Sequence, residues 1–206
     1  HRHKKQSGGH GQFGEVYLEL EPLPRGSGVI FDEKVVGGSV PKNFIPAVEK
    51  GVHERVTEGV LAGYPLVDMR VALYDGKYHE VDSSEMSFHI AGSMAVKSGM
   101  EDPAARAVLL EPIMLLTVTV PDSYTGDIMG DLTSKRGRVL GIDPANGKSV
   151  ISAHVPLAEV QRYATDLRSM TQGRGTFTAS QDHYEDVPGH LAQAIIEAAK
   201  KERGEK

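Results

Sequence analysis

Apolar and polar positions alternate in short stretches of the first half of the chain, and each stretch predicts a strand. Residues 13–23 alternate and are rich in Val, Tyr and Leu, which predicts a strand that ends at Pro22 and Pro24. Residues 29–36 predict a second short strand. Residues 66–81 predict a strand, a turn at Asp75-Gly76 and a further strand.

Two helices are predicted between and after these strands. The first has an apolar stripe that recurs at three- and four-residue steps, with a proline in its first turn and Gly63 beyond its end: Ile45, Val48, Val52, Val56 and Val60. The second is predicted to begin at Asp82 as the N-cap, with Glu85 completing a capping box. Its core-facing stripe is predicted to be Met86, Ile90 and Met94.

The second half of the chain has a more regular pattern. In chain order it predicts a strand, a helix, two strands joined at Asn146-Gly147, a helix and a last strand, over residues 108–120, 123–135, 139–142, 149–155, 157–170 and 176–183. This β-α-β-β-α-β order is typical of the ferredoxin-like fold. A C-terminal helix is predicted to open at Pro188. The break at Glu101-Asp102-Pro103 separates the halves, so we expect an α+β protein with domains over residues 1–104 and 105–206.

The amino-acid composition excludes several classes of protein. The chain has no cysteine, which excludes disulfides and thiolate zinc sites, and its longest apolar runs are too short to span a bilayer. We therefore expect a cytoplasmic, monomeric protein without a membrane partner. The net charge of −5 disfavours a broad basic face for nucleic acid, so any RNA contact must be local.

The segment S-G-G-H-G-Q-F-G-E-V at residues 7–16 fits two functions. Its glycines match the nucleotide loop of protein kinases, but the chain has no V-A-I-K lysine, no H-R-D and no D-F-G, which excludes a kinase. The same segment is also typical of a loop that probes RNA, because glycines at 8, 9 and 11 let the backbone and its N–H groups approach phosphate and ribose. Since the chain opens directly on basic residues and this loop, we expect a fragment that begins inside a strand.

Several longer segments carry a family resemblance. Three of them are similar to the fourth domain of bacterial elongation factor G: K-K-Q-S-G-G-H-G-Q-F-G at 4–14, V-G-G-S-V-P-K-N-F-I-P-A-V-E-K-G at 36–51, and Y-P-L-V-D-M-R-V-A-L-Y-D-G-K-Y-H-E-V-D-S-S-E-M-S-F at 64–88. Three others resemble its fifth domain: L-L-E-P-I-M at 109–114, G-D-L-T-S-K-R-G at 130–137, and Y-A-T-D-L-R-S-M-T-Q-G-R-G at 163–175.

The resemblance implies the C-terminal part of a ribosomal translocase or of a close paralogue. It implies that the first domain has the fold of the second domain of ribosomal protein S5, with a left-handed β-α-β crossover, and reaches the tRNA–mRNA duplex in the small-subunit decoding region. It also implies that the RNA-contacting tip loops comprise Ser7, Gly8, Gly9, His10, Gly11, Gln12 and His79. Lys135, Arg136 and Arg168 are either surface charges or, by the resemblance, part of the face toward the large-subunit stalk base.

In this family an N-terminal domain binds GTP or GDP with Mg²⁺. The present sequence has no G-x-x-x-x-G-K-[ST] phosphate loop, so we expect no cofactor in this chain and no enzymatic activity of its own. His10 stands where arginine is frequent and Glu15 where histidine is common, and both changes predict a weaker attraction to phosphate. These departures leave a role in ribosome recycling or ribosomal protection open beside translocation. A free-standing RNA-binding module is disfavoured by the net charge.

Three further patterns carry no prediction of a site. His1 and His3 with His10 lack a suitably placed carboxylate for a metal. Ser180 with Asp182-His183-Tyr184 lacks the nucleophile elbow of a hydrolase. Arg174 to Phe177 lacks a second stacking aromatic on a partner strand, which RNA-recognition motifs need. We therefore expect neither catalytic residues nor a metal site.

Overall fold

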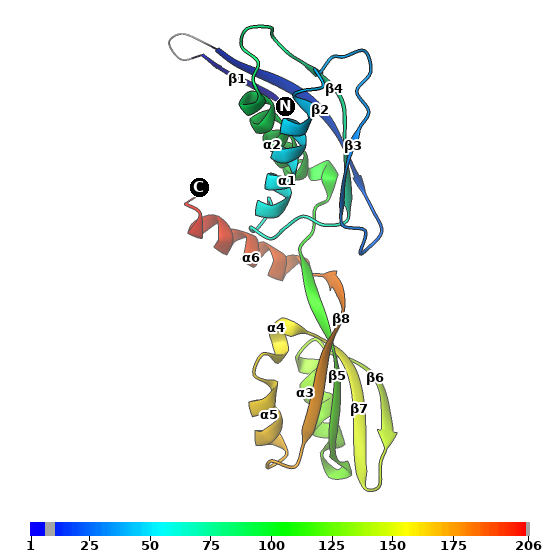
Figure 1. Cartoon of the computed structure of the whole chain (residues 1–206). Coiled ribbons are helices and arrows are strands. Elements are labelled where there is room, and N and C mark those ends of the chain that lie inside the picture. Colours follow the sequence, from blue (N-terminus) through cyan, green and yellow to red (C-terminus); the bar gives the residue numbers. More distant parts are fainter. Residues whose placement is uncertain (7–10, 205–206) are drawn as a thin grey trace. The chain divides into compact units, whose positions relative to one another are not determined.

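The computed structural model of the 206-residue chain describes residues 1–6 and 11–204. They form two compact units, each with its own four-stranded sheet (Figure 1). Residues 1–107 and 193–206 make up the first unit, and residues 108–192 the second. The predicted α+β class is confirmed. In the part of the chain that the structure describes, no helix is both long and apolar enough to cross a membrane.

The first unit contains a sheet in the order β1-β2-β4-β3 and two helices. Its elements are β1 (Arg2–Gln6), β2 (Gly11–Pro22), β3 (Val29–Glu33), α1 (Ile45–Glu58), β4 (Met69–Lys77) and α2 (Glu85–Glu101). The β3–β4 pair is parallel, and the other two pairs are antiparallel. A parallel pair cannot be joined by a short hairpin, and α1 lies in the long connection between its strands.

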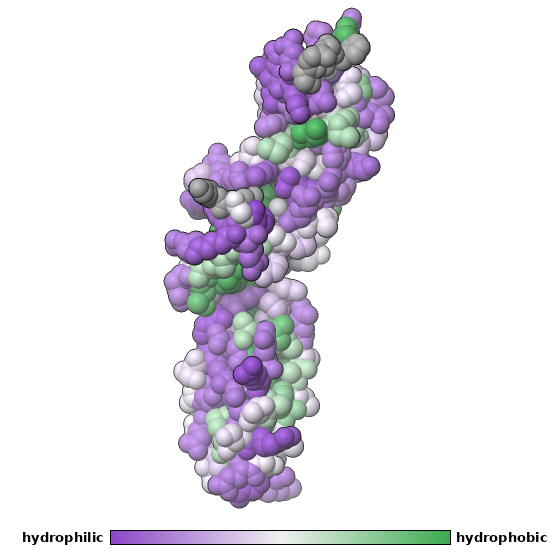
Figure 2. All heavy atoms as spheres, turned by 90° about the vertical axis from the view of Figure 1, so that its left-hand side faces the viewer, coloured by the Kyte–Doolittle hydropathy of each residue, from purple (hydrophilic) through white to green (hydrophobic). Residues whose placement is uncertain are grey.

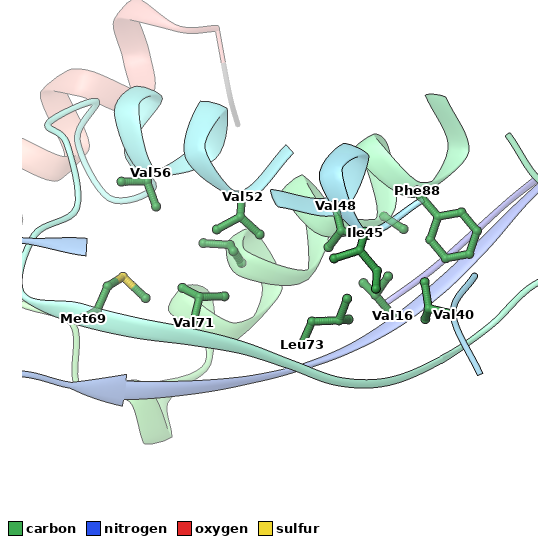
Figure 3. Close-up of a cluster of buried hydrophobic side chains, with 12 residues drawn as sticks. Val16, Val40, Ile45, Val48, Val52, Val56, Met69, Val71, Leu73 and Phe88 are labelled. Atoms are coloured by element: carbon green, nitrogen blue, oxygen red, sulfur yellow. The ribbon is translucent and has the colours of Figure 1, made fainter. Parts of the chain in front are cut away.

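The core of the first unit lies between α1, α2 and one face of the sheet (Figure 3). The valine stripe predicted for α1 is confirmed for Val48, Val52 and Val56, which are buried and point toward β4. The predicted end is wrong, because α1 ends at Glu58 with Gly59 as its C-cap and Val60 lies beyond it. The facing side chains on that strand are Met69, Val71 and Leu73. Burial of apolar area contributes roughly 25 cal/mol per Å², so this stripe is the main force that holds α1 on the sheet.

The start and the buried face of α2 differ from the prediction. The N-cap is Ser84 rather than Asp82, and Ser84 and Ser87 form the capping box. Met86 is 60% exposed, whereas Phe88, Ala91 and Val96 are fully buried. Small residues face α1 because the two helices approach closely, and the methionine spacing did not reveal this.

The turn predicted at Asp75-Gly76 is also wrong, because β4 runs through it as one strand. A register shift lies opposite, between Tyr17 and Leu18 of β2, which accommodates an irregular strand pair. A Cβ atom on Gly76 would lie 2.4 Å from Val40 Cγ2 and 2.5 Å from the Glu15 carbonyl oxygen. Glycine is therefore required here for close packing inside a strand rather than for a turn.

The second unit has the predicted β-α-β-β-α-β order, with an antiparallel sheet ordered β6-β7-β5-β8. Its elements are β5 (Leu110–Pro121), α3 (Thr125–Ser134), β6 (Arg138–Pro144), β7 (Lys148–Pro156), α4 (Leu157–Val160), α5 (Tyr163–Met170) and β8 (Thr176–Asp186). The single helix predicted over 157–170 is divided into α4 and α5 at Gln161-Arg162. Short 3₁₀ turns at Pro103–Ala105, in the first unit, and at Asp122–Tyr124 precede β5 and α3. The C-terminal helix α6 spans Gly189–Glu202, and its residues from Gln193 on belong to the first unit.

One face of this second sheet is covered by its helices and the other is open. Ile151, Ala153 and Val155 of β7 are fully buried in a core that includes Ile128, Leu132, Tyr163 and Leu167 of the helices. The alternate residues of β7 therefore face the open side. On the view in Figure 2, hydrophilic residues cover most of the described surface and hydrophobic ones gather in small groups.

Candidate nucleic-acid interface

The structure brings two of the candidate segments together at one end of the first sheet. The Phe13 N–H donates to the Asp82 carbonyl oxygen at 2.9 Å, and the Gly11 N–H donates to Asp82 Oδ1 at 3.1 Å. The Ser83 hydroxyl in turn donates to the Phe13 carbonyl at 2.9 Å. We call residues 11–13 and 78–83 the tip. Because three hydrogen bonds join segments about 70 residues apart in sequence, the tip is one surface and not two independent loops.

His79 is held against this junction by its own loop. Its ring meets the Phe13 ring edge-on, with centroids 6.5 Å apart. The backbone N–H groups of Val81 and Asp82 point at His79 Nδ1, each at 3.4 Å, so Nδ1 acts as the acceptor and the neutral ring carries its proton on Nε2. Asp82 Oδ2 also lies 3.6 Å from Nδ1, a pairing that needs a proton on that atom, and we favour the acceptor role because two donors share it. The side chain is 59% exposed and presents Nε2–H as a donor.

Gly11 and Gln12 have fewer hydrogen-bonding groups left for RNA than the sequence predicted. Gly11 was expected to offer its N–H to phosphate, but Asp82 already accepts that hydrogen bond. Gln12 is half-buried, and its Oε1 lies 3.0 Å from His3 Nε2, which leaves its amide N–H groups for a ligand. Ser7, Gly8, Gly9 and His10 lie outside the described residues.

The charge beside the tip also differs from the prediction. Glu15 was expected to add a negative charge there, yet it is only 5% exposed. Arg2 Nε donates to it at 2.6 Å and the Tyr17 hydroxyl at 2.7 Å, and these bonds hold the pKa of the Glu15 carboxyl below its ordinary value. Its charge is therefore compensated inside the sheet and does not repel a phosphate at the tip.

Lys4 and Lys5 are the cationic residues that the sequence reasoning passed over. Both are exposed on β1, where they lie opposite Phe13 and Gln12 of β2. In the described part of the chain neither takes part in an ion pair. They give the end of this sheet a local positive charge in a protein of net charge −5. Their position directly before the glycine segment was the available signal, as in other basic arms beside RNA-probing loops.

The three cationic residues predicted to face the ribosome in the second unit differ in burial and in ion pairing. Arg136 Nη1 and Nη2 donate to both oxygens of Glu111 at 2.7 and 2.9 Å, and Arg136 Nε donates to Glu159 at 2.8 Å. Lys135 donates to Asp131 at 2.8 Å and lies 3.2 Å from Asp166. Of the three, only Arg168 is exposed. Arg136 therefore joins β5 to α4, Lys135 joins α3 to α5, and Arg168 lies outside these ion pairs.

Phe177 takes no part in a stacking surface. Its ring packs edge-on against the buried Tyr163 ring, with centroids 5.1 Å apart, and Arg174 lies over the Tyr124 ring. The sheet of the second unit therefore shows no pair of exposed aromatic rings on the strands of an RNA-recognition motif, within the residues described.

Comparison with known proteins matches each of the two units to a family model. Residues 1–103 match the family model "Elongation factor G, domain IV", and residues 108–195 match "Elongation factor G C-terminus". The chain is 53% identical over its full length to an "Elongation factor G-like protein" of Thermotoga maritima, of which it covers 30%. It is 54% identical over 192 residues to "Elongation factor G" of Aquifex pyrophilus, which spans 93% of the chain and 27% of that relative.

A solved structure agrees with these matches. A crystal structure of a Thermus thermophilus protein has a TM-score of 0.78 and 43% identity, and covers 97% of this chain and 30% of the solved one. The chain thus spans less than a third of the length of each of these three proteins.

Proposed function

Because the chain belongs to the elongation factor G family, we propose that it supplies the part of a ribosomal translocase that contacts the tRNA–mRNA duplex in the decoding region. In this proposal the tip holds the duplex as it moves, and the second unit faces the ribosome near the large-subunit stalk base. In this proposal translocation takes place in the cytoplasm, where ribosomes translate mRNA.

The observation that carries the proposal is the joining of the tip by Asp82 and Ser83. A protein that grips RNA through two loops needs both at a fixed separation, because each loose loop would lose conformational entropy on binding. The tip offers the Nε2–H of His79 and the amide of Gln12, and the exposed side chains of Lys4 and Lys5 lie beside it on β1. Neutral donors with nearby cations suit riboses and phosphates without requiring a particular base.

We further propose that GTP and Mg²⁺ bind to a part of the protein beyond this sequence. The chain has no complete G-x-x-x-x-G-K-[ST] motif, because Lys148-Ser149 follows Gly147 directly but Ile142 stands where the motif needs its first glycine. The isolated 206-residue chain is therefore expected to show no GTP hydrolysis above the buffer rate, with or without ribosomes. Ribosome-dependent hydrolysis by this chain alone would contradict this part of the proposal.

The test is a translocation assay with the full-length factor that carries this sequence. Toeprinting on a pre-translocation ribosome complex reports the position of the mRNA, and phosphate release reports GTP hydrolysis. His79→Ala is expected to slow mRNA movement by roughly tenfold and to leave GTP hydrolysis unchanged. A tenfold loss of rate corresponds to about 1.4 kcal/mol of lost transition-state stabilisation. His53→Ala is the matched control, because this histidine is half-exposed on α1 and outside the tip.

A second candidate is a paralogue that acts in ribosome recycling or ribosomal protection. It is favoured by His10 in place of the frequent arginine and by the name of the Thermotoga maritima relative, which is called elongation factor G-like. If the wild-type factor hydrolyses GTP on ribosomes but leaves the mRNA in place, translocation is excluded. Splitting of post-termination ribosomes, followed by light scattering, then distinguishes recycling from protection.

A further inference from the structure

A compact group of metal-ligating side chains lies on the second unit. His154, Asp182 and His183 each place one ligand atom within 4.8 Å of the others. Asp182 Oδ2 is 2.6 Å from His183 Nδ1 and 3.5 Å from His154 Nε2. The two imidazole rings meet edge-on with centroids 5.1 Å apart. These are two nitrogens and one oxygen converging on one point from two strands.

The fold brings these residues to the open face of the sheet. His154 alternates with the buried Ala153 and Val155 of β7, so it faces away from the helices. On β8, His183 pairs with Ile113 and Gln181 with Met114, which leaves Asp182 as the extra residue of a bulge. Neighbours on a regular strand would face opposite sides, but the bulge lets Asp182 and His183 share one face. Bulges commonly re-aim side chains at functional sites.

We propose that this group binds a Zn²⁺ ion through His154 Nε2, Asp182 Oδ2 and His183 Nδ1. Two imidazoles and a carboxylate are a donor set typical of open zinc sites, in which water completes the tetrahedron. A tetrahedral site with ligands at about 2.1 Å separates its ligand atoms by about 3.4 Å. The present separations bracket that value, so small rotations of the exposed Asp182 and the half-buried His154 and His183 side chains are enough to close the site.

The surroundings of His183 support the assignment. Glu185 Oε1 lies 2.7 Å from His183 Nε2, so this carboxylate would keep accepting the Nε2 proton once zinc takes the place of the proton on Nδ1. A carboxylate behind a ligating histidine fixes its tautomer and raises its basicity at metal sites. Asp182 and Glu185 together offset the two positive charges of the ion. The zinc would replace the proton that now joins Asp182 to His183.

Arg138 opposes binding of the ion. Its Nη2 lies 3.3 Å from His154 Nδ1. Arginine can only donate, so this contact uses the lone pair of Nδ1 and leaves the proton on Nε2, the proposed ligand atom. Zinc binding must therefore displace the exposed Arg138 side chain. A glutamine at position 138 could accept the proton of Nδ1 instead and would remove a repelling charge.

The site has room for an additional ligand. A shallow pocket beside the group is lined by His154, Glu185 and Arg138, with Ile113 and Pro156 among its other residues. A bound ion would tie the bulge of β8 to β7 across the central strand β5. We therefore expect it to stabilise the second unit rather than to catalyse a reaction.

Isothermal titration calorimetry of the 206-residue chain with ZnCl₂ tests the proposal. Wild type is expected to bind one equivalent at this site, and Co²⁺ in its place is expected to give the visible absorption of a tetrahedral ion. His183→Gln and Asp182→Asn are expected to weaken binding by at least tenfold, Glu185→Gln by about tenfold. Arg138→Gln is expected to tighten binding several-fold. Mg²⁺, which prefers oxygen ligands, is expected to give no heat.

Matched controls separate this site from other histidines. His190→Gln changes an exposed histidine of the same unit, and His3→Gln removes a ligand from any site at the amino terminus. Both are expected to bind as wild type does, and circular dichroism confirms that every variant is folded. Absence of zinc binding by wild type, equal affinity in His183→Gln, loss of binding in His3→Gln, or no tightening in Arg138→Gln would each overturn the assignment.

Discussion

Glu15 is a residue whose acid–base chemistry is changed by its neighbours. Its carboxylate accepts hydrogen bonds from Arg2 and Tyr17 while buried, so its pKa lies below the ordinary 4.5. A lowered carboxyl pKa means that the charged form stabilises the fold above about pH 4.5, and that this stabilisation is lost as pH falls through the native pKa. Glu15→Gln should therefore lower the free energy of unfolding at neutral pH by roughly 1–3 kcal/mol, and by progressively less in acid.

Urea unfolding followed by circular dichroism at about pH 7 and about pH 3 measures this difference. Glu19→Gln is the control, because Glu19 forms an exposed pair with Lys34 at 3.3 Å and such pairs contribute about 0–1 kcal/mol. An equal effect of the two substitutions at neutral pH, or a Glu15→Gln effect that persists in acid, would show that the buried bonds are not the source of the stability.

Arg136 and Arg168 differ in burial and pairing, as Glu15 and Glu19 do, although both arginines looked like surface charges in the sequence. Removing Arg136 leaves Glu111 without its bidentate partner at a largely buried position, where one unpaired charge is costly. Arg136→Ala is expected to destabilise the second unit by roughly 2 kcal/mol, and Arg168→Ala by less than about 0.5 kcal/mol because that side chain is exposed. Urea midpoints compare the two directly, and a larger effect from Arg168 would contradict the assignment of Arg136 to structure.

Among the elements, the contact between α1 and α2 depends on glycine. A Cβ atom on Gly51 would lie 2.0 Å from the His89 carbonyl oxygen, which is backbone of the other helix and cannot move alone. Helix propensity favours alanine over glycine by about 1 kcal/mol, but the overlap outweighs it. Gly51→Ala is therefore expected to destabilise the first unit by roughly 1–3 kcal/mol.

Gly130 in α3 provides the opposite case. It is exposed, and an added Cβ would meet no atom within 4 Å. Gly130→Ala is therefore expected to stabilise the second unit by about 0.5–1 kcal/mol through propensity alone. Thermal unfolding of the two variants gives the signs, and the same sign for both would show that close packing is not what requires glycine at position 51.

The elements also show where the sequence was a sufficient guide. The valines of α1 and the chain order of strands and helices in the second unit follow from spacing, because apolar burial imposes a period that the sequence displays. Asp75-Gly76 and Asp82 were misread because their roles depend on distant partners. Gly76 meets Val40, and Asp82 binds Gly11 across 71 positions of the chain. The resemblance pointed to His79, but only the tertiary contact with Phe13 shows how the tip is held.

At the scale of the whole molecule, the two cores share no residue, since one is built from residues between 16 and 96 and the other from residues between 116 and 167. A local loss of packing should then raise opening only in the unit that contains it. Hydrogen exchange measured by mass spectrometry is expected to rise in peptides of residues 1–107 for Gly51→Ala and in those of 108–192 for Arg136→Ala. Faster exchange in both units from either substitution would mean that they unfold as one cooperative body, and that the tip cannot be altered without affecting the second unit.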